Sequence, residues 1–293
     1  MLERGDIKFL WVNSMNPAVT IPNQEAVRKG LIRDDIFTVV HETHWTETTR
    51  YADVVLPSPT FLEKDDLLLS YSHRYVTKSN KVIEPMGESR DEGWLTKTLA
   101  ERLKLKEEWL TEEPWKVLET AFSGALKDGS FNDIVNGQIV SLRLRPVEEY
   151  QTPSGRIEFY SKTAPKLGAT PLPLQQPVDD MEEGFTLITS CTPNYTHSQF
   201  QEVYGPIEAI IWLHPEDAEE LDISDGAEVT LSNKQGKVSA HVKITDRTQR
   251  GVIWSPRLWR GLEGQPQNWV IQGKAQSLGG GPTFHSTKVR INS

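Results

Sequence analysis

The segment Ile7-Lys-Phe-Leu-Trp-Val-Asn-Ser-Met-Asn-Pro17 decides how the first part of this chain folds. Its apolar half predicts a buried strand, and its polar half predicts a loop directly after that strand. Similar patterns follow: residues 36–40 and 53–56 predict strands, and residues 24–31 and 46–52 predict helices. Alternation of strands and helices favours a parallel sheet covered by helices.

The middle of the chain is less regular. Residues 92–105 predict an amphipathic helix that carries Trp94, Leu95, Leu99 and Leu103 on one side. Further along, Pro114 occupies a favourable first position for another helix.

A proline-rich segment follows these helices. The sequence Pro153-Ser-Gly155 predicts a turn into a short strand, and four prolines between Pro165 and Pro177 predict an extended linker.

The last part of the chain predicts mainly strands. These expected strands are residues 185–189, 209–213, 229–231, 237–244, 251–254 and 288–291. A short helix is expected at residues 215–221, and Asn233-Lys-Gln-Gly236 indicates a hairpin. Short strands with one interposed helix favour a small barrel. The predicted fold class is therefore α/β followed by mainly β, divided into residues 1–105, 106–183 and 184–293.

Composition excludes several classes of protein. The net charge of −9 provides no basic surface for nucleic acid. The single cysteine, Cys191, excludes an internal disulfide framework and a cysteine-rich metal cluster. No apolar run reaches the length of a membrane span. These features indicate a globular protein whose binding sites depend on locally placed groups.

Two polar loops follow strands of the predicted sheet. Asn13 and Asn16 follow the first strand, and His41 and Glu42 follow the second. Open α/β sheets bind ligands at the carboxyl ends of their strands. A carboxylate and an amide suit a guanine edge, which presents adjacent N–H groups. Loop capping is the alternative for any one of these residues, but two adjacent loops favour a nucleotide pocket.

A third polar loop follows the first strand of the predicted barrel. It runs from Thr189 to Ser198, and its small residues expose backbone N–H groups and hydroxyls that suit a pyrophosphate. For His197 a structural hydrogen bond, and for Cys191 a buried apolar position, are the alternatives. Lys64 is either a charge for a phosphate or an ordinary surface lysine. Asp91 and Glu92 either serve the site or stabilise a helix N-terminus.

Several ordered motifs resemble the C-terminal part of the molybdopterin oxidoreductases of the dimethyl-sulfoxide-reductase type. The motifs are the loop ending in Asn16-Pro17, Tyr51-Ala-Asp-Val-Val-Leu-Pro57, Leu62-Glu-Lys64, Glu84-Pro-Met-Gly-Glu88, Thr152-Pro-Ser-Gly-Arg-Ile-Glu-Phe159, Leu187-Ile-Thr-Ser-Cys191 and His214-Pro-Glu-Asp-Ala218. The resemblance covers residues of about 5–105 and 150–293. It implies a partial Rossmann-like α/β domain followed by a molybdopterin dinucleotide-binding double-psi β-barrel.

The same resemblance implies which residues contact molybdopterin guanine dinucleotide. The first set is Asn16, His41, Glu42, Lys64 and Glu92 or its neighbour Asp91. The second set is Thr189, Ser190, Cys191, His197, Ser198, Asn268 and His285, with Trp259 or Arg260 lining the same pocket.

The chain departs from the family pattern at four positions. His41 replaces a small polar residue, and His214 replaces an asparagine. His285 replaces a lysine and Cys191 replaces an arginine, so two expected cations are absent.

The resemblance implies the C-terminal part of a molybdenum or tungsten oxidoreductase, related to the thiosulfate or polysulfide reductases or to formate dehydrogenase. The metal ligand and the iron–sulfur cysteines belong to a region before the matched one, so no catalytic or metal-binding residue is assigned. The isolated chain is expected to be inactive and to lack bound cofactor. Its expected partners are that missing region, or an upstream polypeptide, and an electron-transfer iron–sulfur subunit.

Two alternatives remain: a non-catalytic scaffold subunit, and a truncated gene product without cofactor. The compartment is not assigned. A complete chain would be cytoplasmic, whereas a twin-arginine signal on a missing part would direct it to the periplasm.

Overall fold

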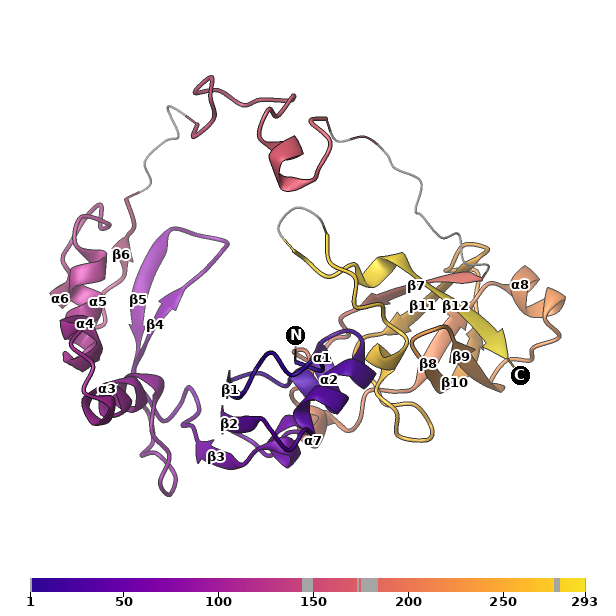
Figure 1. The fold of residues 1–293 in the computed structure, drawn as a ribbon, viewed down its shortest axis with the longest axis horizontal. Coiled ribbons are helices and arrows are strands. Elements are labelled where there is room, and N and C mark those ends of the chain that lie inside the picture. The colour runs from indigo at the N-terminus through magenta and orange to yellow at the C-terminus, as the bar shows by residue number, and fades with distance from the viewer. Residues whose placement is uncertain (1, 144–149, 173, 175–183, 277–279, 293) are drawn as a thin grey trace.

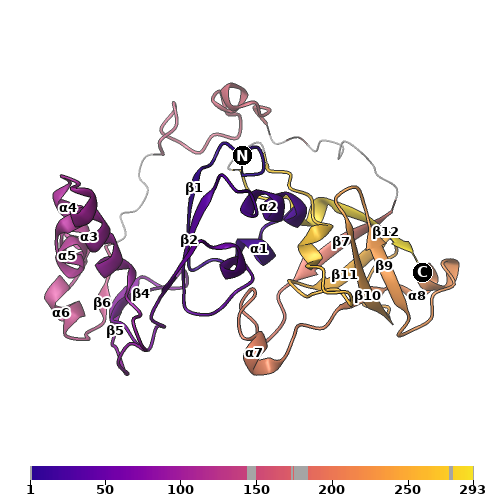
Figure 2. The ribbon, with the colours of Figure 1, turned by 60° about the horizontal axis from the view of Figure 1, so that its bottom comes forward.

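The computed structural model describes residues 2–143, 150–172, 174, 184–276 and 280–292. A three-stranded sheet with its helices lies between a helical unit on one side and a β-barrel on the other, as Figures 1 and 2 show. The mixed α/β class with a closed barrel agrees with the prediction from sequence.

The sheet of the first unit is parallel, as predicted. Its strands are β1 (Phe9–Asn13), β2 (Phe37–Glu42) and β3 (Val54–Pro57), in the order β1-β2-β3. In this register Asn13 lies beside His41, so the ends of β1 and β2 reach the same edge.

Two short helices follow β1, and a 3-10 helix follows β2. Their bounds are Pro17–Thr20 for α1, Gln24–Leu31 for α2 and Thr48–Tyr51 for the 3-10 helix. Pro17 occupies the first turn of α1, and the Asn23 side chain caps α2 by accepting from the Ala26 N–H. The α-helix expected at residues 46–52 is therefore a shorter 3-10 helix. In Figures 1 and 2, α1 and α2 lie between the sheet and the barrel.

A second unit lies on the other side of the sheet. Its antiparallel strands are β4 (Asp66–Leu69), β5 (Tyr75–Ser79) and β6 (Val140–Ser141), and its helices are α3 (Glu92–Leu103), α4 (Glu108–Thr111), α5 (Pro114–Phe122) and α6 (Phe131–Val135). A small core of Val76, Phe131, Ile134 and Val140 holds it together. The sequence did not predict the hairpin β4–β5, because its strands lack clear alternation of apolar and polar residues. The pairing of β5 with β6 crosses the predicted boundary between residues 105 and 106.

Residues 150–172 connect the helical unit towards the barrel. The expected turn is present, since the Gly155 N–H donates to the Thr152 carbonyl and Gly155 has a φ of +67°. The strand predicted after it is absent, because residues 156–160 pair with no other strand in the described chain. A 3-10 helix, Ala164–Leu167, interrupts the expected extended linker. Residues 173 and 175–183 of that linker lie outside the described residues.

The last unit is a closed six-stranded barrel with the order β10-β8-β11-β7-β12-β9. Its strands are β7 (Phe185–Ser190), β8 (Ile210–Leu213), β9 (Glu228–Ser232), β10 (Lys237–Ile244), β11 (Val252–Pro256) and β12 (Thr287–Asn292). Its helices are α7 (Gln201–Tyr204) and α8 (Pro215–Glu220), with 3-10 helices Gln267–Trp269 and Phe284–Ser286. The expected β9–β10 hairpin is confirmed.

Alternation along each strand builds the barrel core. In β11, Ile253 and Ser255 point inwards and are fully buried, whereas Trp254 is only partly buried. Leu187, Ile211, Leu231 and Ile253 are each 0% exposed. Closure removes free strand edges, so the barrel supplies its own core.

The barrel and the first unit are joined by direct contacts. The buried Asn268 side-chain amide donates to the carbonyls of Val19 (3.1 Å) and Thr20 (2.9 Å). The Asn23 N–H donates to the Ile271 carbonyl at 3.0 Å. These bonds fix α1 and α2 against the barrel and thereby set the relative positions of the polar loops.

Within the described ranges, no helix combines the length and the apolar character needed to cross a bilayer.

Candidate functional site

Asn16 is the centre of the loop that follows β1. Its Oδ1 accepts from the Thr48 hydroxyl (2.7 Å) and the Thr48 N–H (3.2 Å). Its Nδ2 donates to the Ser198 hydroxyl at 3.3 Å. Asn16 therefore links the β1 loop, the segment after β2 and the loop after β7. The predicted polar loops of the two units meet at this residue.

The loop after β7 is held at three points. The His285 Nε2 bonds the Thr189 carbonyl at 2.9 Å, and the Trp254 Nε1 donates to the Ser190 hydroxyl at 3.0 Å. Asn16 provides the third contact, at Ser198. These contacts place the loop along the junction between the barrel and the sheet.

The middle of that loop presents polar groups with few internal partners. The Thr192 hydroxyl oxygen is buried without a hydrogen-bond partner. Within the described residues, the backbone N–H groups of Thr192, Asn194, His197 and Ser198 also lack partners. Cys191 and His197 are exposed, and His197 has a φ of +52°. Cys191 is thus not the buried apolar residue that was one interpretation of the sequence.

Lys64 and Glu92 form an ion pair. The Lys64 ammonium lies 2.7 Å from the Glu92 carboxylate, and only 18% of the Lys64 side chain is exposed. Burial raises the pKa of Glu92, but the hydrogen bond and charge of Lys64 outweigh it, so the pKa lies below its usual value. Lys64 is therefore not an ordinary surface lysine. Asp91, the residue before Glu92, caps α3 by accepting from the Trp94 N–H at 2.8 Å.

His41 is buried, with 1% of its surface exposed. Its Nε2 lies 2.9 Å from the Arg90 carbonyl, and its Nδ1 lies 2.7 Å from the Asn13 side-chain oxygen. Both ring nitrogens are therefore engaged within the chain, and His41 orders the edge of the sheet.

Glu42, next to His41, retains a free carboxylate oxygen. Its Oε1 accepts from the Thr43 N–H at 2.8 Å, whereas Oε2 has no partner among the described residues. This oxygen is available as an acceptor at the carboxyl end of β2.

Three other predicted residues serve the junction or the core. Asn268 fixes α1, as described above. Trp259 is fully buried, and its Nε1 donates to the Ser255 hydroxyl. Arg260 pairs with Glu47 at 2.9 Å, and Glu47 also pairs with Arg28 at 3.2 Å.

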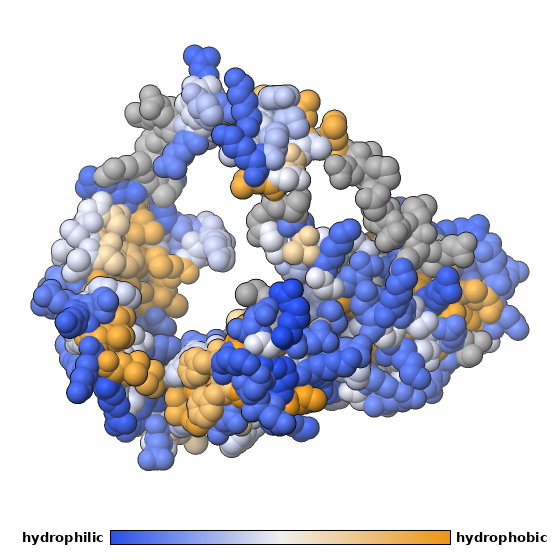
Figure 3. Space-filling model, in the orientation of Figure 1, coloured by the Kyte–Doolittle hydropathy of each residue, from blue (hydrophilic) through white to orange (hydrophobic). Residues whose placement is uncertain are grey.

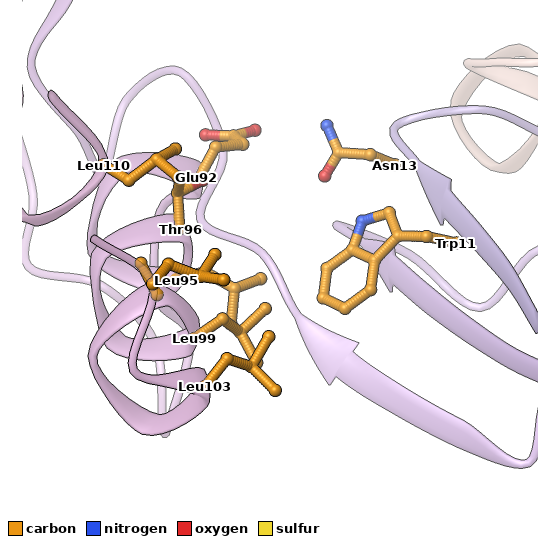
Figure 4. A pocket seen from close by; sticks show the side chains of 10 residues that line it. Trp11, Asn13, Glu92, Leu95, Thr96, Leu99, Leu103 and Leu110 are labelled. Atoms are coloured by element: carbon orange, nitrogen blue, oxygen red, sulfur yellow. The ribbon is translucent and has the colours of Figure 1, made fainter. Parts of the chain in front are cut away.

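A cavity of about 320 Å³ lies between β1 and α3. Figure 4 shows Trp11 and Asn13 facing Glu92 and the leucines of α3. Leu95, Leu99 and Leu103, which the sequence placed on one side of this helix, line the cavity. Trp94 instead lies beside Arg90, whose guanidinium carbon is 5.6 Å from the indole centre. The cavity connects the Glu92 end of the site to an apolar surface.

Sequence patterns alone missed three residues at this site. Thr48 holds Asn16, Glu47 joins the two units, and Trp254 holds Ser190. The polar run Thr46-Glu-Thr-Thr49 was a usable signal for Thr48 and Glu47. Trp254 carried none, because an aromatic residue in a strand usually indicates packing.

Among the described residues, no group of three or more histidine, cysteine, aspartate or glutamate side chains is placed to hold a metal ion. The arrangement instead offers amides, hydroxyls and one carboxylate oxygen around the junction of two units. Such groups can form hydrogen bonds with a polar ligand.

Two protein-family models match the chain. The model described as molybdopterin oxidoreductase matches residues 1–102, and the model described as molydopterin dinucleotide binding domain matches residues 185–288.

Curated relatives match nearly the whole chain. "Probable oxidoreductase YoaE" of Bacillus subtilis is 32% identical over 97% of this chain and 44% of its own length. The dimethyl sulfoxide/trimethylamine N-oxide reductase of Rhodobacter capsulatus is 27% identical over 85% of this chain and 35% of its own length. The F420-dependent formate dehydrogenase subunit alpha of Methanocaldococcus jannaschii is 27% identical over 86% of this chain and 38% of its own length. The chain thus spans less than half the length of these relatives.

A solved structure shares the fold. Acetylene hydratase from Pelobacter acetylenicus superimposes with a TM-score of 0.79 at 21% sequence identity, covering 98% of this chain and 44% of that protein.

Proposed function

Because this chain belongs to the molybdopterin oxidoreductase family, we propose that it forms cofactor-binding walls of a molybdenum or tungsten oxidoreductase. The cofactor would be molybdopterin guanine dinucleotide, bound where the β1, β2 and β7 loops meet. In this proposal the sheet is Rossmann-like and the barrel has the double-psi topology. The matched family models support the cofactor class.

The observation that carries this proposal is the hydrogen bond between Asn16 and Ser198. These residues are 182 positions apart, yet they join the two predicted binding loops at 3.3 Å. A dinucleotide is long enough to contact both units, and this junction is where both present polar groups.

The residues present fit the chemistry of the ligand. The unpartnered Glu42 oxygen suits the adjacent N–H groups of a guanine edge. The unpartnered Thr192 hydroxyl and the N–H groups of the β7 loop suit pyrophosphate oxygens. When bound, the cofactor would supply two-electron redox chemistry, often with transfer of an oxygen atom. This chain would bind it, orient it and exclude water from it.

His41, Lys64, Glu92, Asn268 and His285 act mainly through other residues in this proposal. Each already has an internal partner, so each would position a loop that contacts the cofactor. The exposed Cys191 and His197 would lie at the surface of the site.

The substrate class we propose is a small inorganic sulfur compound or formate. The segment Thr152-Pro-Ser-Gly-Arg-Ile-Glu-Phe159 and the formate dehydrogenase relative support this choice. Because the chain spans 44% of the length of its Bacillus subtilis relative, we propose that turnover also requires the polypeptide that corresponds to the rest of that length.

The first unit offers a surface for that polypeptide. Strand β1 is an edge strand, and Phe9 and Phe37 are exposed on the sheet face that also carries Trp11. In Figure 3 apolar residues are visible beside the sheet and α3. Parallel sheets are normally buried on both faces, so we propose that the partner polypeptide covers this face and pairs with β1. An iron–sulfur subunit would complete the electron-transfer chain.

A non-catalytic scaffold is the second candidate. The closed Lys64–Glu92 pair and the fully engaged His41 favour it, because these groups need no ligand to be satisfied. In that case the junction would serve only to join the two units.

The test is co-expression of this chain with a polypeptide corresponding to the remaining part of a relative. The purified pair should contain pterin, measured by fluorescence after oxidation, and Glu42→Ala should reduce the pterin content. Glu84→Ala, an exposed carboxylate paired with Lys81, is the control and should leave it unchanged. A stable pair without pterin would contradict the proposal and favour the scaffold.

A further inference from the structure

Two tryptophan–serine pairs in the barrel each have an indole N–H that donates to a serine hydroxyl, but they differ in whether that hydroxyl has an acceptor of its own. In the first, the Trp259 Nε1 donates to the Ser255 hydroxyl at 2.6 Å, and that hydroxyl donates to the Ile210 carbonyl at 2.9 Å. In the second, the Trp254 Nε1 donates to the Ser190 hydroxyl at 3.0 Å. The Ser190 proton has no acceptor among the described residues. We call the first pair closed, because its serine hydroxyl has an acceptor within the chain, and the second pair open, because its serine hydroxyl has none among the described residues.

The polarity of the open pair follows from its chemistry. An indole N–H is only a donor, so it occupies a lone pair of the Ser190 oxygen. The hydroxyl proton must then point away from Trp254, towards a different acceptor. Ser190 is partly exposed and is the last residue of β7, where the polar loop begins. Its proton is therefore available to a ligand at the start of that loop.

The surroundings keep Trp254 in place. The centre of its ring lies 4.2 Å from the ring centre of Trp212 on the neighbouring strand β8. Arg247 and Lys243 lie over Trp212, at 4.8 Å and 5.7 Å from its ring centre. Neither cation pairs with a carboxylate in the described part of the chain. The ring contact with Trp212 restricts the Trp254 indole, and both cations lie over the Trp212 ring of this aromatic pair.

We infer that Trp254 is a positioning residue that orients the Ser190 hydroxyl to donate to a phosphate oxygen of the bound ligand. This inference rests on the proposed function and adds to it the chemical group that Ser190 recognises. Position 191 carries a cysteine in this chain where the family pattern has an arginine, so a hydroxyl donor at the preceding residue would contribute to holding the anionic part of the ligand.

The test measures binding of GDP and of guanosine to the full chain by calorimetry. Ser190→Ala should weaken GDP binding about tenfold, because it removes a hydrogen bond to a charged group. Guanosine lacks phosphates, so its affinity should not change. Ser190→Thr keeps the hydroxyl and should retain most of the GDP affinity.

Trp254→Phe should also weaken GDP binding, by a smaller factor of about three to five. The double variant should bind no more weakly than Ser190→Ala, because the two residues act as one unit. Trp259→Phe is the matched control: the Trp259 ring is fully buried in the barrel core and does not line the pocket as the family resemblance implied, so loss of its bond to Ser255 should leave GDP affinity unchanged. Quenching of Trp254 fluorescence by GDP, lost in Trp254→Phe, would further support the inference.

The outcomes separate the two levels of the proposal. Unchanged GDP affinity in Ser190→Ala, or equal weakening of guanosine and GDP, overturns the inference and leaves the proposed function standing. Additive losses in the double variant overturn the positioning role of Trp254. Failure of the unaltered chain to bind GDP overturns this inference, whereas the proposed function is decided separately by the pterin content of the co-expressed pair.

Discussion

The barrel and the three-stranded sheet differ in how completely they bury their apolar side chains. The barrel is closed, and its inward-facing residues form one large core in which Leu187, Ile211, Leu231 and Ile253 are fully buried. The sheet is open, β1 is at its edge, and Phe9 and Phe37 are 57% and 48% exposed. Both units carry a wall of the same candidate site, but only the barrel is complete in itself.

This difference indicates that the two units contribute differently to the stability of the chain. A closed barrel satisfies its own backbone groups and apolar side chains, and its residues His285 and Trp254 hold the start of the β7 loop. Parallel sheets usually have both faces covered, whereas this sheet leaves the apolar side chains Phe9 and Phe37 exposed. The barrel therefore serves as the stable anchor, and the sheet is the part of this chain whose apolar face stays uncovered.

The largest effect is expected from the barrel core. Leu231→Ala should lower the free energy of unfolding of the barrel by about 2–5 kcal/mol, because it leaves a cavity in a fully buried site. Denaturant unfolding followed by tryptophan fluorescence measures this loss. Leu68→Ala, at a side chain that is 55% exposed in the helical unit, should cost less than about 1 kcal/mol. Similar losses for both variants would contradict the view of the barrel as the stable anchor.

A smaller effect is expected at the junction of the two units. Asn268→Ala leaves the Val19 and Thr20 carbonyls without their donor and should weaken docking by about 1–3 kcal/mol. Hydrogen exchange should increase in residues 17–31 and change little in the barrel.

The matched control for that prediction is Asn233→Ala. Asn233 also donates to two carbonyls, those of Val270 and Lys288, but both lie within the barrel unit. Its loss should accelerate exchange in β9 and β12 instead. If both variants loosened the same segment, the two units would not be independent.

Docking should also depend on pH through Glu47. Burial raises the pKa of Glu47, but the charges of Arg260 and Arg28 outweigh it, so the pKa lies below its ordinary value of 4.5. The ionised carboxylate thus contributes fully above pH 4.5, and its contribution disappears as the pH falls through the lowered pKa. Because Arg260 is partly exposed, we expect a contribution of about 1 kcal/mol.

Proteolysis of the junction between pH 3.5 and 7 measures this dependence. Glu47→Gln should remove the acid-induced loosening and give weaker docking at neutral pH. Glu220→Gln, which removes an exposed partner of Arg250 within the barrel, should leave the profile unchanged. A profile unaffected by Glu47→Gln would assign the pH dependence to another group.

The smallest effect on stability, with a clear effect on association, is expected on the open sheet face. Phe9→Ser and Phe37→Ser should change the free energy of unfolding by less than about 1 kcal/mol, because both rings are half exposed. They should reduce self-association in light scattering, since they remove apolar surface from one continuous face. Tyr71→Ser, at a fully exposed ring on the helical unit, is the control. Equal self-association in all three variants would show that the exposed apolar face of the sheet does not drive self-association.

Much of the fold could be predicted from local patterns. The strands around Leu10, Val39 and Val55 and the helix starting at Pro215 followed from hydrophobic periodicity and from the preference of proline for the first helical turn. The hairpin β4–β5 and the lack of a strand at residues 156–160 were not predicted. The hairpin depends on packing against Phe131 and Ile134, which come more than 50 positions later.

The candidate site could be predicted only as separate loops. The polarity of the loops at Asn16, Glu42 and Ser198 was visible in the sequence, because polar residues directly followed apolar strands. Their side-chain partners were not, since the bonds of His41 to Arg90 and of Trp254 to Ser190 join distant positions.

The sequence by itself determined that this protein has a parallel α/β unit and a β-rich unit, each with a polar loop after its first strand. Periodicity reports which face of a strand or helix is apolar, and it does so within a few residues. Only the tertiary structure decided that β7 lies beside β11, that the barrel closes and that Asn16 reaches Ser198. Pairing between distant segments depends on the shape and polarity of whole surfaces, and no local pattern contains that information.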